Sequence, residues 1–160
     1  MASEPDKLER RGDGPIATNR KARRDFAILE TFQCGISLFG PEVKSLREKH
    51  VSIDEAFART DGGVLTIYGM HIRPYKFSRG EIDPDRPRLL LAHKKEILEM
   101  AKATEEKGTT LIPLRLDFVR GLVKVTIGVA RGKKSWDKRQ VIKKRDADRD
   151  IQRAFKERHK

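Results

Sequence analysis

The residues with the clearest chemical potential form a basic run near the end of the chain. Gly132 ends a segment in which apolar and polar residues alternate, and the only tryptophan, Trp136, then stands among cations. Ammonium and guanidinium groups bind phosphate, and an indole ring offers a face on which a base can stack. The combination predicts contact with RNA. The cations are Lys133, Lys134, Lys138 and Arg139.

The sequence holds no comparable arrangement for catalysis. It contains no glycine-rich phosphate loop, no paired Cys/His spacing and no serine elbow. Its four histidines are scattered, and no carboxylate pair stands out on a predicted apolar surface, as a general acid requires. We therefore expect no enzyme, no catalytic residue, no metal site and no cofactor. The single cysteine, Cys34, excludes an internal disulfide and is expected in the core.

The charge of the chain is large, positive and unevenly distributed. The net charge is +12, which is typical of proteins that bind polyanions. Residues 131–160 hold 13 basic and 5 acidic side chains, whereas residues 19–130 hold 20 and 15. Such a block predicts a mobile interaction arm at the C-terminus. A soluble protein with merely solvated lysines and arginines is the plainer alternative.

The N-terminal residues 1–18 are polar and include glycine and proline, which predicts a flexible leader. They lack the apolar core of a signal peptide, and no apolar run approaches the length of a membrane span. We therefore expect a cytoplasmic protein without a membrane partner. The basic cluster at 19–24 should lie against the domain surface, either as a binding element or as a solubilising flank.

Periodicity predicts the elements that position these residues. The expected strands are 26–32, 36–39, 55–60, 64–72, 109–119 and 122–130, with residues 89–91 re-entering the core. Turns are expected at 33–35, 61–63 and 120–121, and a long proline-containing loop at 73–88. Six short strands with few helices predict a mainly β fold, a small antiparallel barrel.

Two helices are expected to flank this barrel. In the helix at 41–49, Val43 and Leu46 should dock on the sheet. The residues expected off that stripe, toward solvent or a ligand, are Lys44, Ser45, Arg47 and Glu48. The helix at about 93–107 should present an inner stripe of Ile97, Leu98, Ala101 and Thr104.

From residue 132 onward the chain is dense in charge and poor in apolar residues. Ile151 and Phe155 stand four apart, which gives a helix only a thin apolar seam. We expect this tail to be disordered alone and helical when a polyanionic surface neutralises it. Its further cations expected to bind are Lys143, Lys144, Arg145, Arg149 and Arg153.

Three motifs, in order along the chain, resemble the small protein B (SmpB) family, the bacterial partners of transfer-messenger RNA (tmRNA). They are NRKAR at 19–23, EVKSLR at 42–47, and GKK at 132–134 followed by DKR at 137–139. The segments LLL at 89–91 and TLIPL at 110–114 extend the similarity, which covers the chain from residue 19 to the end.

The resemblance implies a fold and a function. The fold would be an OB-like barrel at 19–131 with two to three flanking helices, a leader at 1–18 and a tail at 132–160. The barrel would bind the tRNA-like domain of tmRNA, and the tail would probe the mRNA channel of a stalled ribosome near the decoding centre. The stalled peptide would then be tagged and the ribosome recycled by trans-translation. We expect a monomer.

The resemblance also assigns residues. Those that match tmRNA-binding motifs or positions are Asn19, Lys21, Arg23, Gln33, Glu42, Lys44, Arg47, Leu91 and Lys124. The ribosome-sensing tail would begin at Asp137, Lys138 and Arg139. Trp136 stands where the family often has His or Tyr. An aromatic ring that can stack on a base is therefore retained, whereas a side chain that can be protonated is not. Gln33 stands where the family often has Glu, and Pro41 replaces Thr or Trp.

Two other functions remain open at this stage. A generic barrel that binds rRNA or single-stranded RNA in ribosome assembly would share the charge and the fold, but it would not explain the ordered motifs. An RNA-processing enzyme would need a metal or an acid/base constellation.

Overall fold

The computed structural model of the protein describes residues 14–133 and 135–158, and for residues 135–142 it describes the backbone. The strands are β1 (Gly14–Thr18), β2 (Phe26–Ile36), β3 (Val51–Ser52), β4 (Phe57–Asp61), β5 (Val64–Tyr68), β6 (His71–Ile72), β7 (Arg88–Leu91), β8 (Thr109–Val119) and β9 (Leu122–Gly132). The helices are α2 (Arg20–Asp25), α3 (Gly40–Arg47), α4 (Lys94–Glu105) and α5 (Ser135–Arg158).

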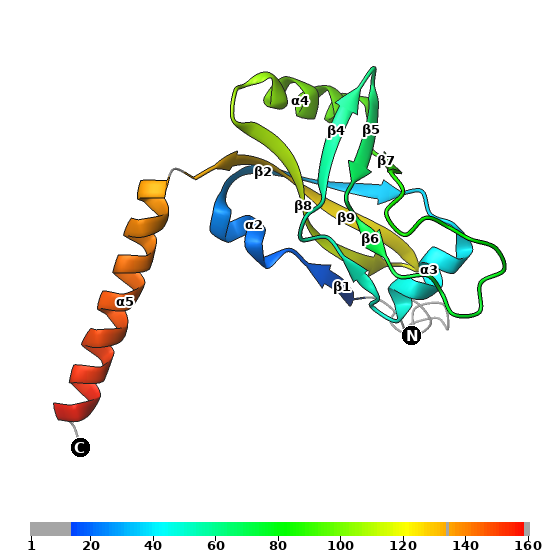
Figure 1. The fold of residues 1–160 in the computed structure, drawn as a ribbon. Helices are drawn as coiled ribbons and strands as arrows, with labels where there is room; N and C mark the ends of the chain where they lie inside the picture. The colour runs from blue at the N-terminus through cyan, green and yellow to red at the C-terminus, as the bar shows by residue number, and fades with distance from the viewer. Residues whose placement is uncertain (1–13, 134, 159–160) are drawn as a thin grey trace, which may run out of the picture.

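The strands close into an antiparallel barrel, which confirms the predicted fold class. Their order is β1-β8-β4-β5-β7-β2-β9, and β9 also pairs with β8, so that the ring is complete. The short strands β3 and β6 form a separate two-stranded sheet. Figure 1 shows α4 at one end of the barrel, α3 at the other, and α5 projecting away from it.

The long hairpin of β8 and β9 supplies much of the core, as its alternation predicts. Leu116, Val125 and Ile127 are fully buried. The two strands are joined through Arg120 and Gly121, whose φ angles are 52° and 75°. Positive φ at both central residues is typical of the two-residue turns that match the twist of a hairpin. The turn at Gly62 and Gly63 joins β4 to β5 in the same way.

The predicted break at residues 33–35 does not occur, because β2 is one continuous strand. Gly35 pairs with Lys124 of β9 on one side and with Leu91 of β7 on the other. A Cβ at Gly35 would lie 3.3 Å from the Cβ of Leu91. The glycine therefore permits a close approach between strands and does not mark a turn.

The predicted inner stripe of α4 is wrong at one position. Leu98 is 54% exposed, whereas Ile97 and Met100 are buried. A helical repeat that starts at Ile97 returns at positions 100, 101 and 104, so Leu98 falls on the outer side.

The predicted leader is too long by five residues. Gly14–Thr18 form β1, which pairs with β8 from Gly14 opposite Phe118 to Thr18 opposite Arg115. Ile16 is buried, so this strand both covers the edge of β8 and adds to the core. The rest of the leader, 1–13, lies outside the described residues.

The tail is one helix, α5, in this structure, where the sequence predicts disorder for the free chain. Its side chains from 143 to 158 are exposed. Because the described side chains of this helix are exposed, the helical stability of residues 143–158 must come from local propensity, and the disorder of the free tail stays a prediction. The boundary between barrel and tail falls after Gly132, one residue beyond the expected position.

Candidate nucleic-acid interface

Three predicted site residues meet on the outer face of the barrel, although they are far apart in the sequence. Leu91 of β7 lies opposite Gly35 of β2, and Gly35 lies opposite Lys124 of β9. Gln33 stands two residues before Gly35 and therefore points to the same face. Gln33 is exposed, Leu91 is 53% exposed and Lys124 is half-buried. We call these three residues the outer-face cluster.

The outer-face cluster owes its continuity to Gly35, which places no side chain between Leu91 and Lys124. The Leu91 side chain leans over the glycine, with its Cδ1 3.7 Å from the position that a Cβ would take. An amide, an aliphatic chain and an ammonium group are thus neighbours on one face. They can contact a base edge, a ribose and a phosphate.

Arg115 of β8 borders the outer-face cluster and was not expected from the sequence. It lies opposite Thr126 of β9, which in turn lies opposite Gln33. Arg115 donates from Nε to Asp117 Oδ2 at 2.8 Å and from a terminal nitrogen to Oδ1 at 2.6 Å. These hydrogen bonds, with the charge of Asp117, raise the pKa of Arg115. The alternation of β8 is the signal that could have placed Arg115 on this face.

Asn19 does not reach the surface, which corrects its assignment as an RNA contact. Only 3% of it is exposed. Its Nδ2 donates to the carbonyl oxygens of Ile53 and Pro113, at 3.3 and 3.1 Å. Its Oδ1 accepts the N–H of Ala22 at 3.1 Å and so caps α2. Asn19 therefore anchors α2 to the barrel.

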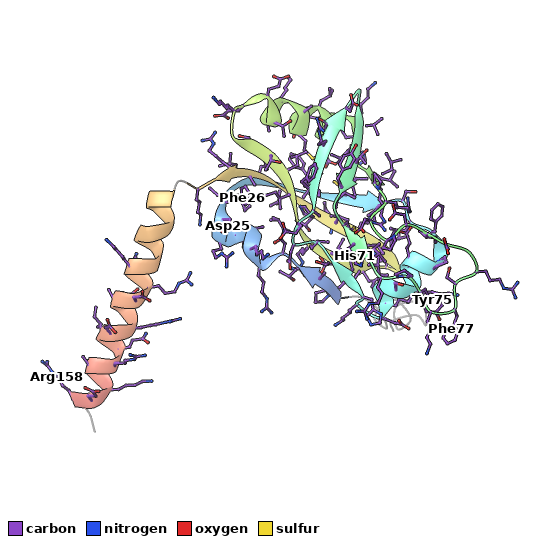
Figure 2. The ribbon with its side chains drawn as sticks, viewed as in Figure 1. Asp25, Phe26, His71, Tyr75, Phe77 and Arg158 are labelled. Carbon is purple, nitrogen blue, oxygen red and sulfur yellow. The ribbon has the colours of Figure 1, made fainter. Side chains whose placement is uncertain are left out.

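The cations of α2 lie beside the start of the tail. Lys133 donates from its backbone N–H to Asp25 O at 3.0 Å and from Nζ to Arg23 O at 3.1 Å. Figure 2 shows Asp25 and Phe26 where α2 passes into β2. Arg23 is exposed, and the exposed Lys21 pairs with Glu55 at 3.1 Å. The basic helix α2 is thus hydrogen-bonded to Lys133, where the basic tail begins.

Glu42 is buried as well, and its assignment to an RNA-facing surface is wrong. It is 4% exposed. Its Oε1 accepts from the backbone N–H of Phe39 at 2.9 Å and from Arg86, and its Oε2 accepts from Arg88 Nε at 2.7 Å. Arg88, whose side chain is fully buried, also donates to the carbonyl oxygens of Met70 and Pro84.

These contacts keep the Glu42 carboxyl ionised. Burial alone raises its pKa, but the hydrogen bonds from Arg86, Phe39 and Arg88, with the charge of Arg88, hold that pKa below its ordinary value. Burial lowers the pKa of Arg88, and Glu42 opposes that change. The pair therefore forms an ionic link between α3 and β7.

The exposed face of α3 carries the remaining predicted residues. Lys44 lies with its Nζ 5.3 Å from the centroid of the Tyr75 ring, and Arg47 with its Cζ 5.2 Å from that of Phe118. Ser45 was expected to face outward, but it is buried and donates to Arg73 O at 2.7 Å. A helix this close to the barrel has only a narrow outer face.

The structure thus brings the predicted residues together in separate areas: the outer-face cluster, α2 with Lys133, and α3. On α5 the exposed predicted cations are Lys143, Lys144, Arg145, Arg149 and Arg153. The predictions for Lys134, Trp136, Asp137, Lys138 and Arg139 concern side chains outside the described residues.

The described part of the chain contains neither a membrane-spanning helix nor a group of possible metal ligands. Among its helices, none combines the length and the apolar character needed to cross a membrane. Within residues 14–133 and 135–158, no three His, Cys, Asp or Glu side chains are grouped to hold a metal ion.

Comparison with known proteins adds four findings. A family model described as SmpB protein matches residues 16–157. The SsrA-binding protein of Listeria monocytogenes is 49% identical over 150 residues, which are 92% of this chain and 97% of that protein. The SsrA-binding protein of Carboxydothermus hydrogenoformans is 48% identical over 145 residues, 90% of this chain and 97% of that one. A solved chain described as tmRNA–SmpB of the bacterial ribosome is 47% identical, with a TM-score of 0.65, and the match covers 76% of this chain and 87% of that one.

Proposed function

The chain belongs to the SmpB family, and from this premise we propose that it binds tmRNA and delivers it to stalled ribosomes for trans-translation. Its barrel binds the tRNA-like domain of tmRNA. Its tail senses the empty mRNA channel and binds small-subunit rRNA near the decoding centre. The protein acts in the cytoplasm, as a monomer.

The observation that carries the proposal is the outer-face cluster. Gln33, Leu91 and Lys124 come from three strands and lie together because β2 pairs with β7 on one side and with β9 on the other. Their side chains match the three parts of a nucleotide, and the curved face suits a folded RNA more than a single phosphate. This supports recognition of a structured RNA by the barrel.

The division of charge supports a separate role for the tail. Residues 131–160 hold 13 basic and 5 acidic side chains, and the α5 cations from Lys143 to Arg158 are exposed. Contact with rRNA phosphates would stabilise this helix, because the phosphates would neutralise its cations and so reduce the repulsion between them. We assign Trp136 to stacking on an rRNA base, which an indole ring can do without a change in protonation.

The experiment that tests the proposal compares the full chain with a 1–133 truncation, which keeps Lys133 and its bonds to α2. Both are titrated with the tRNA-like domain of tmRNA and then assayed for tagging on stalled ribosomes. We expect equal affinity for the RNA and loss of tagging in the truncation. Failure of the full chain to bind the tRNA-like domain would contradict the function.

RNA recovered with the protein from cells separates this function from a generic one. One dominant tmRNA species is expected. Bulk rRNA without tmRNA would instead favour a module of ribosome assembly.

A further inference from the structure

A cavity of about 670 Å³ lies between α3 and the loop of residues 73–87. Its walls combine the apolar surfaces of Pro41, Ile72 and Tyr75 with the polar side chains of Glu81 and Asp83. The cavity belongs to the end of the barrel that carries α3, far from the tail helix α5 (Figure 1). Of the described residues assigned above to tmRNA or rRNA, Glu42 alone lines it.

The loop that covers this cavity is fastened at both ends. At its start, Arg73 accepts from Ser45 Oγ at 2.7 Å and donates from its N–H to His50 O at 3.0 Å. Near its end, Pro84 O accepts from the N–H of Ile72 and from Arg88, each at 3.0 Å. Because these hydrogen bonds hold both ends of the loop, the cavity is largely formed before any ligand binds.

Aromatic rings and ammonium groups alternate next to Tyr75, which lines the cavity. The Tyr75 ring lies between Lys44 Nζ, 5.3 Å from its centroid, and the Phe77 ring, 5.7 Å away and edge-on. Lys76 Nζ lies 5.9 Å from the Phe77 centroid. Phe77 is 75% exposed, and Figure 2 shows it beside Tyr75 on the loop. Rings interleaved with cations are the surface that unpaired nucleotides recognise.

Two carboxylates in the cavity wall lack a cationic partner within the described part of the chain. Neither Glu81 nor Asp83 forms an ion pair there, and Asp83 uses Oδ1 to accept the N–H of Asp85 at 2.9 Å. Asp85 itself pairs with His71 at 2.8 Å and does not line the cavity. Carboxylates in an aromatic-walled pocket suit a base that offers adjacent N–H donors.

Guanine is the base that fits this chemistry. Its N1–H and N2–H₂ donors are neighbours and can both bond to one carboxylate, whereas adenine presents a single amino group on that edge. The charge near the mouth still suits a phosphate, because the cations outnumber the two carboxylates and Glu42 is neutralised by its own partners. Arg73 lines the cavity, Lys44 and Lys76 lie against the rings of Tyr75 and Phe77, and Arg79 stands in the chain between the lining residues Ser78 and Gly80.

We propose that this cavity receives one unpaired guanine nucleotide of the RNA partner. The base stacks on Tyr75, its Watson–Crick edge bonds to the Glu81 carboxylate, and its phosphate lies near Lys44. The inference rests on the proposed function, which supplies the RNA. The nucleotide can belong to tmRNA or to rRNA, since the same chemistry recognises either.

The first test titrates the isotopically labelled full chain with 5′-GMP and with 5′-AMP, and follows the amide signals of Tyr75, Ser78 and Glu81 by NMR. We expect 5′-GMP to shift them with an affinity about tenfold above that of 5′-AMP. Glu81→Gln should abolish that preference, and Tyr75→Leu should weaken both nucleotides. Asp85→Asn removes the same charge from the same loop outside the cavity and should change neither.

The second test identifies the RNA. The same variants are titrated with the tRNA-like domain of tmRNA and, separately, with small ribosomal subunits. The RNA whose affinity falls in Tyr75→Leu and Glu81→Gln, but not in Asp85→Asn, is the source of the nucleotide. The proposal is overturned if 5′-GMP leaves the three signals unmoved, if the shifts survive both variants, or if neither RNA is affected. Normal binding of the tRNA-like domain with no effect of 5′-GMP contradicts the cavity alone, and not the proposed function.

Discussion

Glu42 and Asn19 belong to motifs that predict RNA contact, yet both are engaged inside the protein. Glu42 bonds to Arg86, Arg88 and the backbone of Phe39, and Asn19 bonds to three backbone groups. We therefore expect such residues to influence RNA binding through the helices that they hold. On α3 the side chains free to touch RNA are Lys44 and Arg47, three positions apart and both exposed.

Glu42→Gln should therefore lower stability more than it lowers RNA affinity. The substitution leaves the guanidinium of Arg88 buried without a counter-charge, and loss of one partner of a buried pair costs about 3–5 kcal/mol. Urea denaturation measures the free energy of unfolding, and a titration below the transition measures binding of the tRNA-like domain. Glu48→Gln is the matched control: Glu48 follows the same helix, is exposed, and should change stability by less than about 0.5 kcal/mol. A stable Glu42→Gln with weak RNA binding would return Glu42 to the interface.

Glu42 also predicts how stability depends on pH. Because its pKa is lower in the folded protein than in the unfolded chain, the unfolded chain binds more protons as the pH falls. Its contribution to the free energy of unfolding is therefore complete above the ordinary value of 4.5 and is lost as the pH falls through the lower, folded value. Urea curves at about pH 7 and about pH 3 should show a smaller loss in Glu42→Gln than in the natural protein. An equal loss in both would exclude Glu42 as a source of the acid sensitivity.

Trp136→Ala should separate two activities. We expect nearly unchanged affinity for the tRNA-like domain, and impaired tagging because about 1–3 kcal/mol of stacking on an rRNA base is lost. Trp136→Phe keeps an aromatic face and should retain most of the tagging. If Trp136→Ala weakened binding of the tRNA-like domain to the same extent, Trp136 would belong to the tmRNA interface.

At the scale of elements, prediction succeeded where the pattern is local. β8 spans Thr109–Val119 as predicted, and β9 extends the predicted strand by two residues, because alternation and a two-residue turn are encoded within each segment. β2 was predicted as two strands, because a glycine beside polar residues resembles a turn. Its continuity depends on β7 and β9, which lie far along the chain.

Lys124→Ala should weaken binding of the tRNA-like domain about tenfold without unfolding the barrel, since a hydrogen bond to a charged group contributes roughly 1.5 kcal/mol. Lys124 lies on the outer side of β9, so its removal leaves no cavity in the core. Lys102→Ala, on the exposed side of α4, removes the same charge away from the outer-face cluster and is the control. Equal losses in the two variants would mean that only net charge matters.

At the scale of the whole molecule, the barrel and the tail differ in charge. Residues 19–130 carry a modest excess of 20 basic over 15 acidic side chains, whereas residues 131–160 carry 13 basic and 5 acidic ones, and the described side chains of α5, from 143 to 158, are exposed. Lys133 joins the two through its bonds to the end of α2. Recognition by the barrel should therefore depend on specific contacts, and recognition by the tail on phosphate neutralisation.

The salt dependence of ribosome binding should report this division. Each phosphate contact contributes about −0.7 to −0.9 to the slope of the logarithm of affinity against that of salt concentration. If the eight predicted cations that follow Lys133 each make one contact, truncation to 1–133 should flatten that slope by about 5.6–7.2. Binding of the tRNA-like domain by the same truncation provides the comparison. An unchanged slope on ribosomes would contradict the assignment of the tail.

The sequence by itself determined the class of fold, the strands with a strong local period, the unequal division of charge, and the motifs that resemble the family. Each of these features depends on residues that are close together in the sequence. Only the tertiary structure decided which motif residues reach solvent: it buried Asn19, Glu42 and Ser45, and it brought Gln33 and Lys124 beside Leu91. The physical reason is that burial and juxtaposition depend on segments distant in the chain, through strand pairing and ionic contacts that no local pattern specifies.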